Sequence, residues 1–405
     1  MIKEGGNENM KNINKWINGA LPAFLMHLSA GTIYAFSLFV KPLSQYMGYS
    51  EFQIQFAFSL AIFFLGMSAA FGGKIVEDNI EKASKIGLIG FIGGLILTAI
   101  AIEFKSLLYL YLGYGVIHGI GLGFTYLTPC KTVMLHFKEN KGLAIGLSVM
   151  GFGFASTFAS PLITNLLEAN VNRLSMVFID LIAIYAIPLI ISRWLLKKPE
   201  DYTHNVSKKE TFKYNDLFKN KTFWAIWLML FINIHCGLAL ISIASPMLIE
   251  LGSDAVLIAL IIAVMGLCNG GGRIIFATIS DFLSHRIFMY LLLFSLSIIA
   301  VYSYIILPNV FTMGLMLCGI SAFFGAGFSN IAPMIADKFG IENVSKIHGV
   351  VLSSWAIAGL TGNSMSLLIH QITGSYELIY SILGVLYTVG LLCSIYLCIN
   401  YRSVE

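Results

Sequence analysis

The sequence predicts an all-α membrane protein of twelve transmembrane helices, arranged as two pseudo-symmetric six-helix bundles. Three observations lead to this prediction: the composition, the spacing of the apolar segments and a repeat between the two halves of the chain. Hydrophobic residues make up 57% of the 405 residues and charged residues only 11%, whereas an ordinary soluble chain carries about 25% charged residues. A mean hydropathy of +0.82 agrees with a chain that lies mostly in a lipid bilayer.

Twelve long apolar segments follow one another along the chain. A helix needs about 20 mostly apolar residues to cross the hydrocarbon core of a bilayer. The expected segments are 17–46, 51–76, 83–104, 106–137, 141–168, 174–196, 222–250, 254–280, 285–307, 309–337, 346–373 and 375–400. The long polar stretch between the sixth and the seventh divides the chain. We therefore expect a tail over 1–16, an N-terminal bundle over 17–196, a linker over 197–221, a C-terminal bundle over 222–400 and a tail over 401–405.

The basic residues of the loops predict the orientation. Nearly all of them lie on the face shared with the N-terminus, and the opposite loops carry only Lys105 and Arg173. Because basic loops stay on the inner side of a membrane, both termini and the linker are predicted to be cytoplasmic. We expect a multi-pass protein of the cell (plasma or inner) membrane, a monomer surrounded by lipid, with no nucleic-acid partner.

The two halves repeat at a nearly constant offset. The string "GLGFTYLTP" in the fourth segment and "GAGFSNIAP" in the tenth share two Gly, a Phe and a Pro at an offset of 204 residues. Asp78 after the second segment and Asp281 after the eighth are 203 residues apart. Parallel repeats of this kind are typical of transporters that hold substrate between two bundles near the bilayer midplane.

One permanent charge lies inside the eighth segment, in "GLCNGGGRIIFATISD". Placing Arg273 in a membrane helix costs about 2.5–3.5 kcal/mol on insertion scales. The nearest carboxylate along this helix, Asp281, is eight residues or about 12 Å away. A substrate carboxylate matches the fork of a guanidinium, so Arg273 is predicted to anchor one, with Asn269 on the same helix face. The alternative is a structural charge paired with a carboxylate of the protein.

Several motifs together resemble a known family. They are "GTIYAFSLFVKPL", "GIGLGFTY", "KGLAIGLSVMGFGFAS", "NGGGRIIFATISD" and "DKFGIENVSKIHG". With them the chain resembles the major facilitator superfamily, and within it the oxalate–formate antiporter family, close to the monocarboxylate transporters. The resemblance implies alternating access by two bundles, a small organic anion as substrate and contact of Arg273 with the substrate carboxylate.

The resemblance also implies further substrate contacts. It places Lys131 and Tyr126 of the fourth segment at the cavity, although Lys131 could instead extend toward the headgroups and Tyr126 could be a packed aromatic. Tyr34 in the first segment and Asn330 in the tenth complete the candidates. Trp355 stands where the oxalate exchanger has a second cation, which favours a monoanion with an apolar tail, unless Trp355 only fills the core.

The sequence departs from the family pattern at the residues expected for proton coupling and for the cytoplasmic gate. The animal-type monocarboxylate carriers have an Asp where this chain has Asn269, so His27 and His118 are the candidate proton carriers, although a lone His in a membrane helix more often packs. The candidate gate residues are Asp78, Asp281 and Arg286. In the loop after the second segment, the superfamily's Arg and Gly are missing, so that side of the gate is expected to be built differently.

Neither a metal cluster nor a nucleophile–base pair occurs in the sequence, so we expect no enzyme, no metal and no cofactor. The predicted function is secondary active transport of a small monocarboxylate such as formate, lactate or pyruvate, by exchange or symport. One alternative is a dicarboxylate exchanger of the oxalate type that uses Lys131 together with Arg273. Another is a membrane receptor that binds a carboxylate without transporting it.

Overall fold

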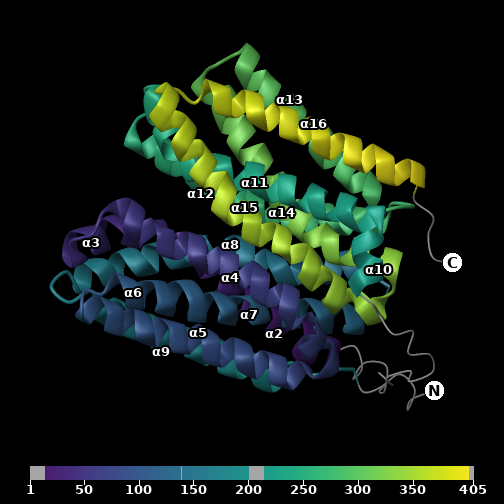
Figure 1. Ribbon diagram of the computed structural model, residues 1–405, viewed down its shortest axis with the longest axis horizontal. Helices are drawn as coiled ribbons and strands as arrows, with labels where there is room; N and C mark the ends of the chain where they lie inside the picture. The colour runs from purple at the N-terminus through teal and green to yellow at the C-terminus, as the bar shows by residue number, and fades with distance from the viewer. Residues whose placement is uncertain (1–13, 138, 200–213, 401–405) are drawn as a thin grey trace, which may run out of the picture.

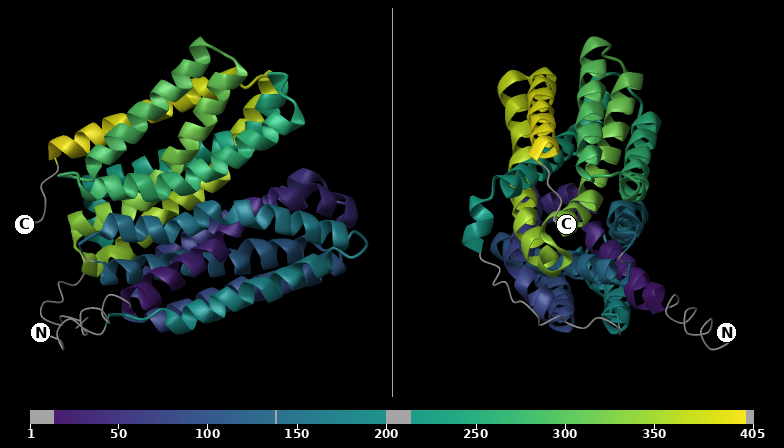
Figure 2. Two further views of the ribbon diagram at one scale, coloured as in Figure 1. Left: turned by 180° about the vertical axis from the view of Figure 1, so that it is seen from behind. Right: turned by 90° about the vertical axis from the view of Figure 1, so that its right-hand side faces the viewer.

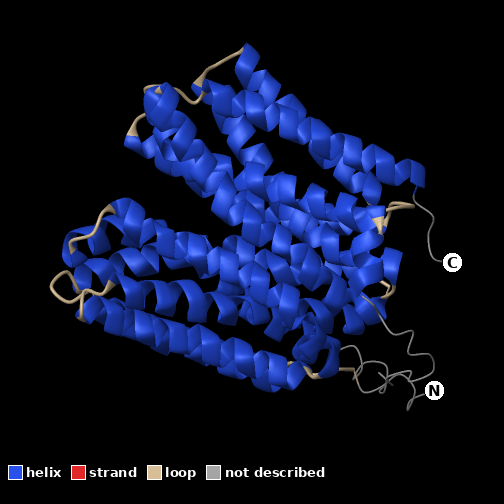
Figure 3. Cartoon of the chain, in the orientation of Figure 1, coloured by secondary structure: helices blue, strands red, loops and turns tan. Residues whose placement is uncertain are grey.

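The computed structural model describes residues 14–137, 139–199 and 214–400. Within these ranges every element is helical and no strand occurs, as Figure 3 shows. Most of the two predicted tails and of the predicted linker lies outside the described residues. The described chain therefore has the all-α fold predicted from its composition.

The first half of the chain forms one group of helices. Short π and 3-10 segments interrupt the first and the fourth predicted spans. The bounds are η1 Trp16–Ala20, α2 Leu21–Ala30, η2 Gly31–Ala35, α3 Ser37–Met47, α4 Glu51–Asp78, α5 Ile80–Glu103, α6 Leu107–Leu110, η3 Tyr111–His118, α7 Gly119–His136, α8 Lys141–Ala169 and α9 Ser175–Leu195.

The second half forms a similar group. It begins with a short helix before the seventh predicted span and has a 3-10 turn before the eleventh. The bounds are α10 Tyr214–Lys219, α11 Lys221–Glu250, α12 Ala255–Asp281, α13 Ile287–Ile306, α14 Val310–Phe339, η4 Ile341–Asn343, α15 Val344–Thr373 and α16 Glu377–Asn400.

The helices account for the twelve predicted segments, with one change of shape. Ten helices of the described chain are long and apolar enough to cross a membrane. The first segment is not one straight helix, because its two parts meet at an angle of 56°. The bend lies one turn before Pro42, whose ring removes a backbone donor and crowds the preceding turn. The remaining segment, the eleventh along the chain, is α15, whose 30 residues are long enough to span a bilayer.

The two groups of helices lie side by side as two bundles, as Figure 1 shows. The described chain begins and ends at the same end of the molecule, which we call the terminal end. Toward the opposite end the ribbons of the two bundles move apart in Figure 1, and both views of Figure 2 show the same two groups. The contacts between the bundles are therefore concentrated between the middle and the terminal end.

Two helix pairs make most of the contact between the bundles: α4 with α15 and α8 with α12. Glycines allow the close approach. A Cβ atom on Gly73 of α4 would collide with the backbone of α15 at the carbonyl oxygen of Ser345, and one on Gly142 of α8 would collide with α12 at the carbonyl oxygen of Ala277. These collisions show that the bundles meet backbone to backbone at the terminal end.

Candidate functional site

Arg273 lies in the middle of the contact between the bundles. Its side chain is fully buried, and its Nε donates a hydrogen bond of 3.1 Å to Oδ1 of Asn269, one turn earlier in α12. No hydrogen-bond partner in the described part of the chain reaches Nη1 or Nη2. A buried charge without a charged partner costs several kcal/mol, so these two nitrogens are candidates for contact with an anionic ligand.

Aromatic rings from both bundles surround this guanidinium. Its Cζ lies 5.6 Å from the ring centre of Phe152 in α8 and 5.0 Å from that of Phe328 in α14. The two rings therefore contribute cation–π attraction from opposite bundles. They also form apolar walls, and a charged ligand between them would be shielded from water.

Three polar side-chain groups, two hydroxyls and one indole N–H, lie around the same rings. The Tyr34 hydroxyl lies beside the guanidinium, and the Tyr34 ring packs 5.2 Å from that of Phe152. The Tyr126 ring lies 5.3 Å from that of Trp355, which in turn lies 4.6 Å from Phe328. Both hydroxyls and the indole Nε1 are buried without a hydrogen-bond partner in the described chain.

These six residues form the central cluster: Tyr34, Tyr126, Phe152, Arg273, Phe328 and Trp355. It presents two guanidinium nitrogens, two hydroxyls and one indole N–H, all unsatisfied, and its only charge is positive. Such a set of donors between apolar walls suits a small anion with a planar, bidentate acceptor group. The structure thus brings together Arg273, Tyr34, Tyr126 and Trp355, four of the residues expected at the site from the sequence.

The other candidates lie differently. Asn330 is buried in α14, and its amide donates to the carbonyl oxygen of Ala326, while its Oδ1 lacks a partner in the described chain.

His27 is anchored on both ring nitrogens, by the carbonyl oxygen of Tyr126 and the hydroxyl of Ser148. His118 packs inside the N-terminal bundle, where its Nδ1 contacts the carbonyl oxygen of Phe91. Both histidines are thus part of hydrogen-bonded packing.

Lys131 is not free to hold a ligand in this structure. Its ammonium lies 2.9 Å from Oε2 of Glu77 and also donates to the carbonyl oxygen of Ile341. Oε1 of Glu77 accepts from the backbone N–H of Ser345 at 2.8 Å, in the first turn of α15. We call Glu77, Lys131, Ile341 and Ser345 the first latch, because an ion pair of one bundle binds the backbone of the other.

A second latch mirrors the first and consists of Gly142, Leu143, Asp281, Arg286 and Asp337. Asp281 of α12 accepts from the backbone N–H groups of Gly142 and Leu143 at 2.9 and 2.8 Å. These groups open α8, where a carboxylate also faces the positive end of the helix. Arg286 binds Asp281 and, at 2.7 Å, Asp337. Asp281 and Arg286, the two charged residues expected on this side of the gate, therefore both belong to the second latch.

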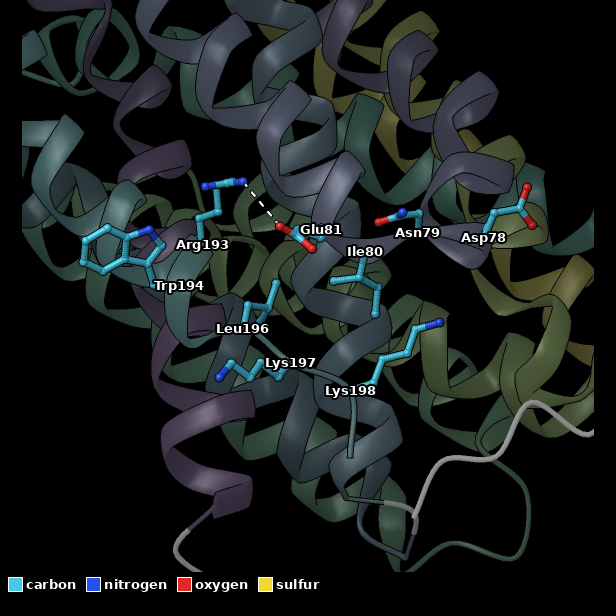
Figure 4. Close-up of a pocket in the computed structure, with 9 residues that line it drawn as sticks. All are labelled: Asp78, Asn79, Ile80, Glu81, Arg193, Trp194, Leu196, Lys197 and Lys198. Atoms are coloured by element: carbon cyan, nitrogen blue, oxygen red, sulfur yellow. Dashed lines mark ion pairs between the residues drawn. The ribbon is translucent and has the colours of Figure 1, made fainter. Parts of the chain in front are cut away.

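The expectation for Asp78 needs correction. The latch carboxylate is its neighbour Glu77, which lies 204 residues before Asp281, the same offset as the other repeat matches. Asp78 is exposed and lines a surface cavity of about 460 Å³ with Glu81, Arg193 and Lys197. Figure 4 shows Asp78 at one side of this cavity and Arg193 reaching toward Glu81, at 3.6 Å, on the other. A helix turns by about 100° per residue, so only one of two adjacent carboxylates can face the other bundle.

Four residues at or near these sites carry little signal in the sequence. Phe152 and Phe328 looked like ordinary apolar residues of membrane helices. Glu77 was hidden by the adjacent Asp78, although the offset of 204 points to Glu77. His348 is buried in α15, neither of its ring nitrogens has a hydrogen-bond partner in the described chain, and its ring lies 6.2 Å from that of Tyr126. In the sequence it is only part of the string "IHG".

The sequence also matches a known protein family. The sequence profile of the Major Facilitator Superfamily matches residues 22–362, most of the chain. The chain belongs to the Major Facilitator Superfamily. It is thus a multi-pass membrane transporter of this superfamily, and the family resemblance read from its motifs is confirmed.

Several known transporters resemble this chain at low sequence identity. The chain is 24% identical to an uncharacterized MFS-type transporter of Escherichia coli over 85% of this chain and 86% of the relative. It is 23% identical to the oxalate:formate antiporter of Oxalobacter formigenes, over 87% and 84% of the two chains. A monocarboxylate transporter 10 of Rattus norvegicus is 26% identical over 68% of this chain and 56% of the relative.

A solved structure shows the same fold. The fucose:proton symporter of Escherichia coli superposes with a TM-score of 0.70 at 18% identity, and covers 93% of this chain and 97% of its own. The two-bundle fold predicted from the sequence is therefore confirmed for this member of the Major Facilitator Superfamily.

Proposed function

We propose that this protein is a secondary transporter of a small monocarboxylate anion, of the formate, lactate or pyruvate type, that works by exchange or symport. The observation that carries the proposal is the buried guanidinium of Arg273, with two nitrogens that no partner reaches in the described chain. A carboxylate would satisfy both nitrogens and neutralise the charge in one step.

The surroundings of Arg273 favour a single negative charge. The central cluster contains one cation, and its remaining walls are rings with neutral donors. A second carboxylate there would be a buried charge without a partner, which costs several kcal/mol. A small apolar tail between Phe152, Phe328 and Trp355 would instead gain contact area.

Alternating access would use the two latches. The moving units are the bundles over 17–196 and 222–400, joined by the linker over 197–221. We place the terminal end on the cytoplasmic side of the cell membrane, because the basic loops gather there. The latches hold that end closed, so in this state a ligand would have to reach the central cluster from the opposite side.

A counterflow assay on purified protein in liposomes tests the proposal. Vesicles loaded with one unlabelled carboxylate should accumulate labelled formate, lactate or pyruvate transiently, whereas protein-free vesicles should not. Oxalate, glucose and an amino acid serve as competitors. If none of the three labelled carboxylates accumulates, the proposal is refuted.

Two alternatives remain distinct outcomes of this assay. A dicarboxylate exchanger that uses Lys131 and Arg273 would prefer oxalate, and its Lys131 would have to leave Glu77 before binding. A receptor would show carboxylate-dependent stabilisation without any counterflow. Only the first of these keeps alternating access.

A further inference from the structure

We propose that His348 carries the proton that accompanies the anion through this protein. This inference rests on the proposed function, since it assigns the coupling step of that transport. It names a residue that the sequence did not single out, in place of the candidates His27 and His118.

The first support is the bonding state of the imidazole. His348 is 1% exposed, and both Nδ1 and Nε2 lack a hydrogen-bond partner in the described chain. A neutral imidazole has one donor and one acceptor, and leaving both unused in a buried place is costly. By contrast, both nitrogens of His27 are bound. An ionisable group kept unsatisfied inside a membrane protein is a candidate for function rather than for packing.

The second support is its position between the latch and the cluster. His348 lies three residues after Ser345, whose N–H is bound by Glu77. Trp355 lies seven residues after His348, which places both side chains on one face of α15. The imidazole ring is 6.2 Å from Tyr126, a member of the central cluster. One side chain therefore adjoins both the candidate ligand site and the contact that must break for release.

The third support is the balance of charge around this imidazole. Glu77 of α4 is already neutralised by Lys131 of α7. The rings of Tyr126 and His27 lie near the imidazole, and Arg273 acts on the same His27. On the helices that contact α15, His235 of α11 is bound to Thr361 and Asp337 of α14 to Arg286, while α15 itself carries Lys346 two residues before His348. Without a ligand, protonation of His348 would add a second buried positive charge to that of Arg273.

A bound carboxylate changes this balance. It neutralises Arg273, so protonation of His348 then adds one uncompensated charge to this buried region instead of a second. Anion binding and proton binding thus favour each other, as linkage requires. The proton binds a ring nitrogen when the bundles part on the side opposite the latches, stays on it while the bundles rock and leaves to water when Ser345 separates from Glu77. No bond other than this N–H forms or breaks.

The test separates exchange from proton-driven uptake in proteoliposomes. Labelled pyruvate and lactate are the probes, and a pH dye inside the vesicles reports protons. Wild-type protein should acidify the lumen during uptake and accumulate probe under an inward proton gradient. His348→Gln should keep exchange at equal pH within about threefold but lose gradient-driven accumulation by about 5–150-fold, the usual size of a coupling between two sites.

His235→Gln is the matched control, because His235 is also a buried histidine of the C-terminal bundle but is hydrogen-bonded to Thr361. It should keep both modes. Full gradient-driven accumulation in His348→Gln, or its loss only in His27→Gln or His118→Gln, would overturn the inference. So would a joint loss of exchange and of probe-dependent thermal stabilisation in both His348→Gln and His348→Asn.

The same assay distinguishes this inference from the proposed function. Wild-type protein that exchanges the probes without any proton movement refutes the role of His348 and leaves carboxylate transport standing. Wild-type protein that neither binds nor moves any carboxylate refutes both.

Discussion

Two buried cations, Arg273 and Lys131, lie at the contact between the bundles, and their surroundings differ. Lys131 has a carboxylate at 2.9 Å and a backbone carbonyl oxygen beside it. Arg273 has one hydrogen bond to an amide oxygen and two nitrogens without a hydrogen-bond partner in the described chain. Burial of a charge is thus common to a latch and to a candidate ligand site. The missing partner is what distinguishes them.

The largest expected effect comes from removing the cation without partners. Arg273→Ala should reduce counterflow to the level of protein-free vesicles and abolish carboxylate-dependent stabilisation, a loss of up to about 5 kcal/mol in binding. Arg273→Lys keeps the charge but not the fork, so it should bind weakly. Thermal unfolding with and without pyruvate measures both variants.

Arg173→Ala is the control for Arg273, because Arg173 is 63% exposed and pairs with Glu103 at the surface. It should leave binding and counterflow unchanged. Normal carboxylate affinity in Arg273→Ala would remove Arg273 from the site and end the comparison with Lys131.

The next effect comes from taking the partner away from Lys131. Glu77→Gln leaves the buried ammonium of Lys131 without a negative partner, and should destabilise the latched state by about 3 kcal/mol. The double variant Glu77→Gln with Lys131→Met should lose less than the sum of the single variants. Unfolding temperature in detergent is the measurement.

Asp78→Asn is the matched control for Glu77→Gln, since it changes the adjacent carboxylate, which is exposed. It should unfold within about 0.5 kcal/mol of the wild type. Equal behaviour of the two variants would mean that the first latch contributes nothing.

A smaller effect tests the backbone contact that supports the first latch. Gly73→Ala places a methyl group against the Ser345 carbonyl, and should destabilise the closed terminal end by about 2 kcal/mol, as overpacking does. Gly93→Ala lies in the same bundle with open space around it, and should be neutral or slightly stabilising. Equal unfolding temperatures for the two would contradict the close approach of α4 and α15.

The smallest expected effect concerns which anion is preferred. Trp355→Lys adds a second cation beside Tyr126 and Phe328, and should shift the preference from monocarboxylates toward oxalate by about tenfold, or 1.4 kcal/mol. Competition against labelled pyruvate measures it. If the wild type already prefers oxalate and Lys131→Ala destroys that preference, Lys131 serves the ligand and the dicarboxylate alternative holds.

The sequence by itself determined the class of fold and pointed to Arg273 as the candidate ligand residue. Composition and segment length fix how many helices lie in a bilayer, because the hydrocarbon thickness sets a minimum length. The offset of 204 residues exposed the two halves. Arg273 could be identified because a charge in an apolar helix is costly wherever the other helices lie, and because α12 contains no carboxylate near it.

Only the tertiary structure decided which charges have partners. Glu77 and Lys131 are 54 residues apart and Glu77 and Ser345 are 268 apart, and no helical spacing relates them. The choice of Glu77 over Asp78, the rings of Phe152 and Phe328 on Arg273 and the unsatisfied imidazole of His348 all depend on how the two bundles meet. The pattern along one helix shows which way a side chain faces, whereas the partner it meets there is set by packing between helices that are far apart in the sequence.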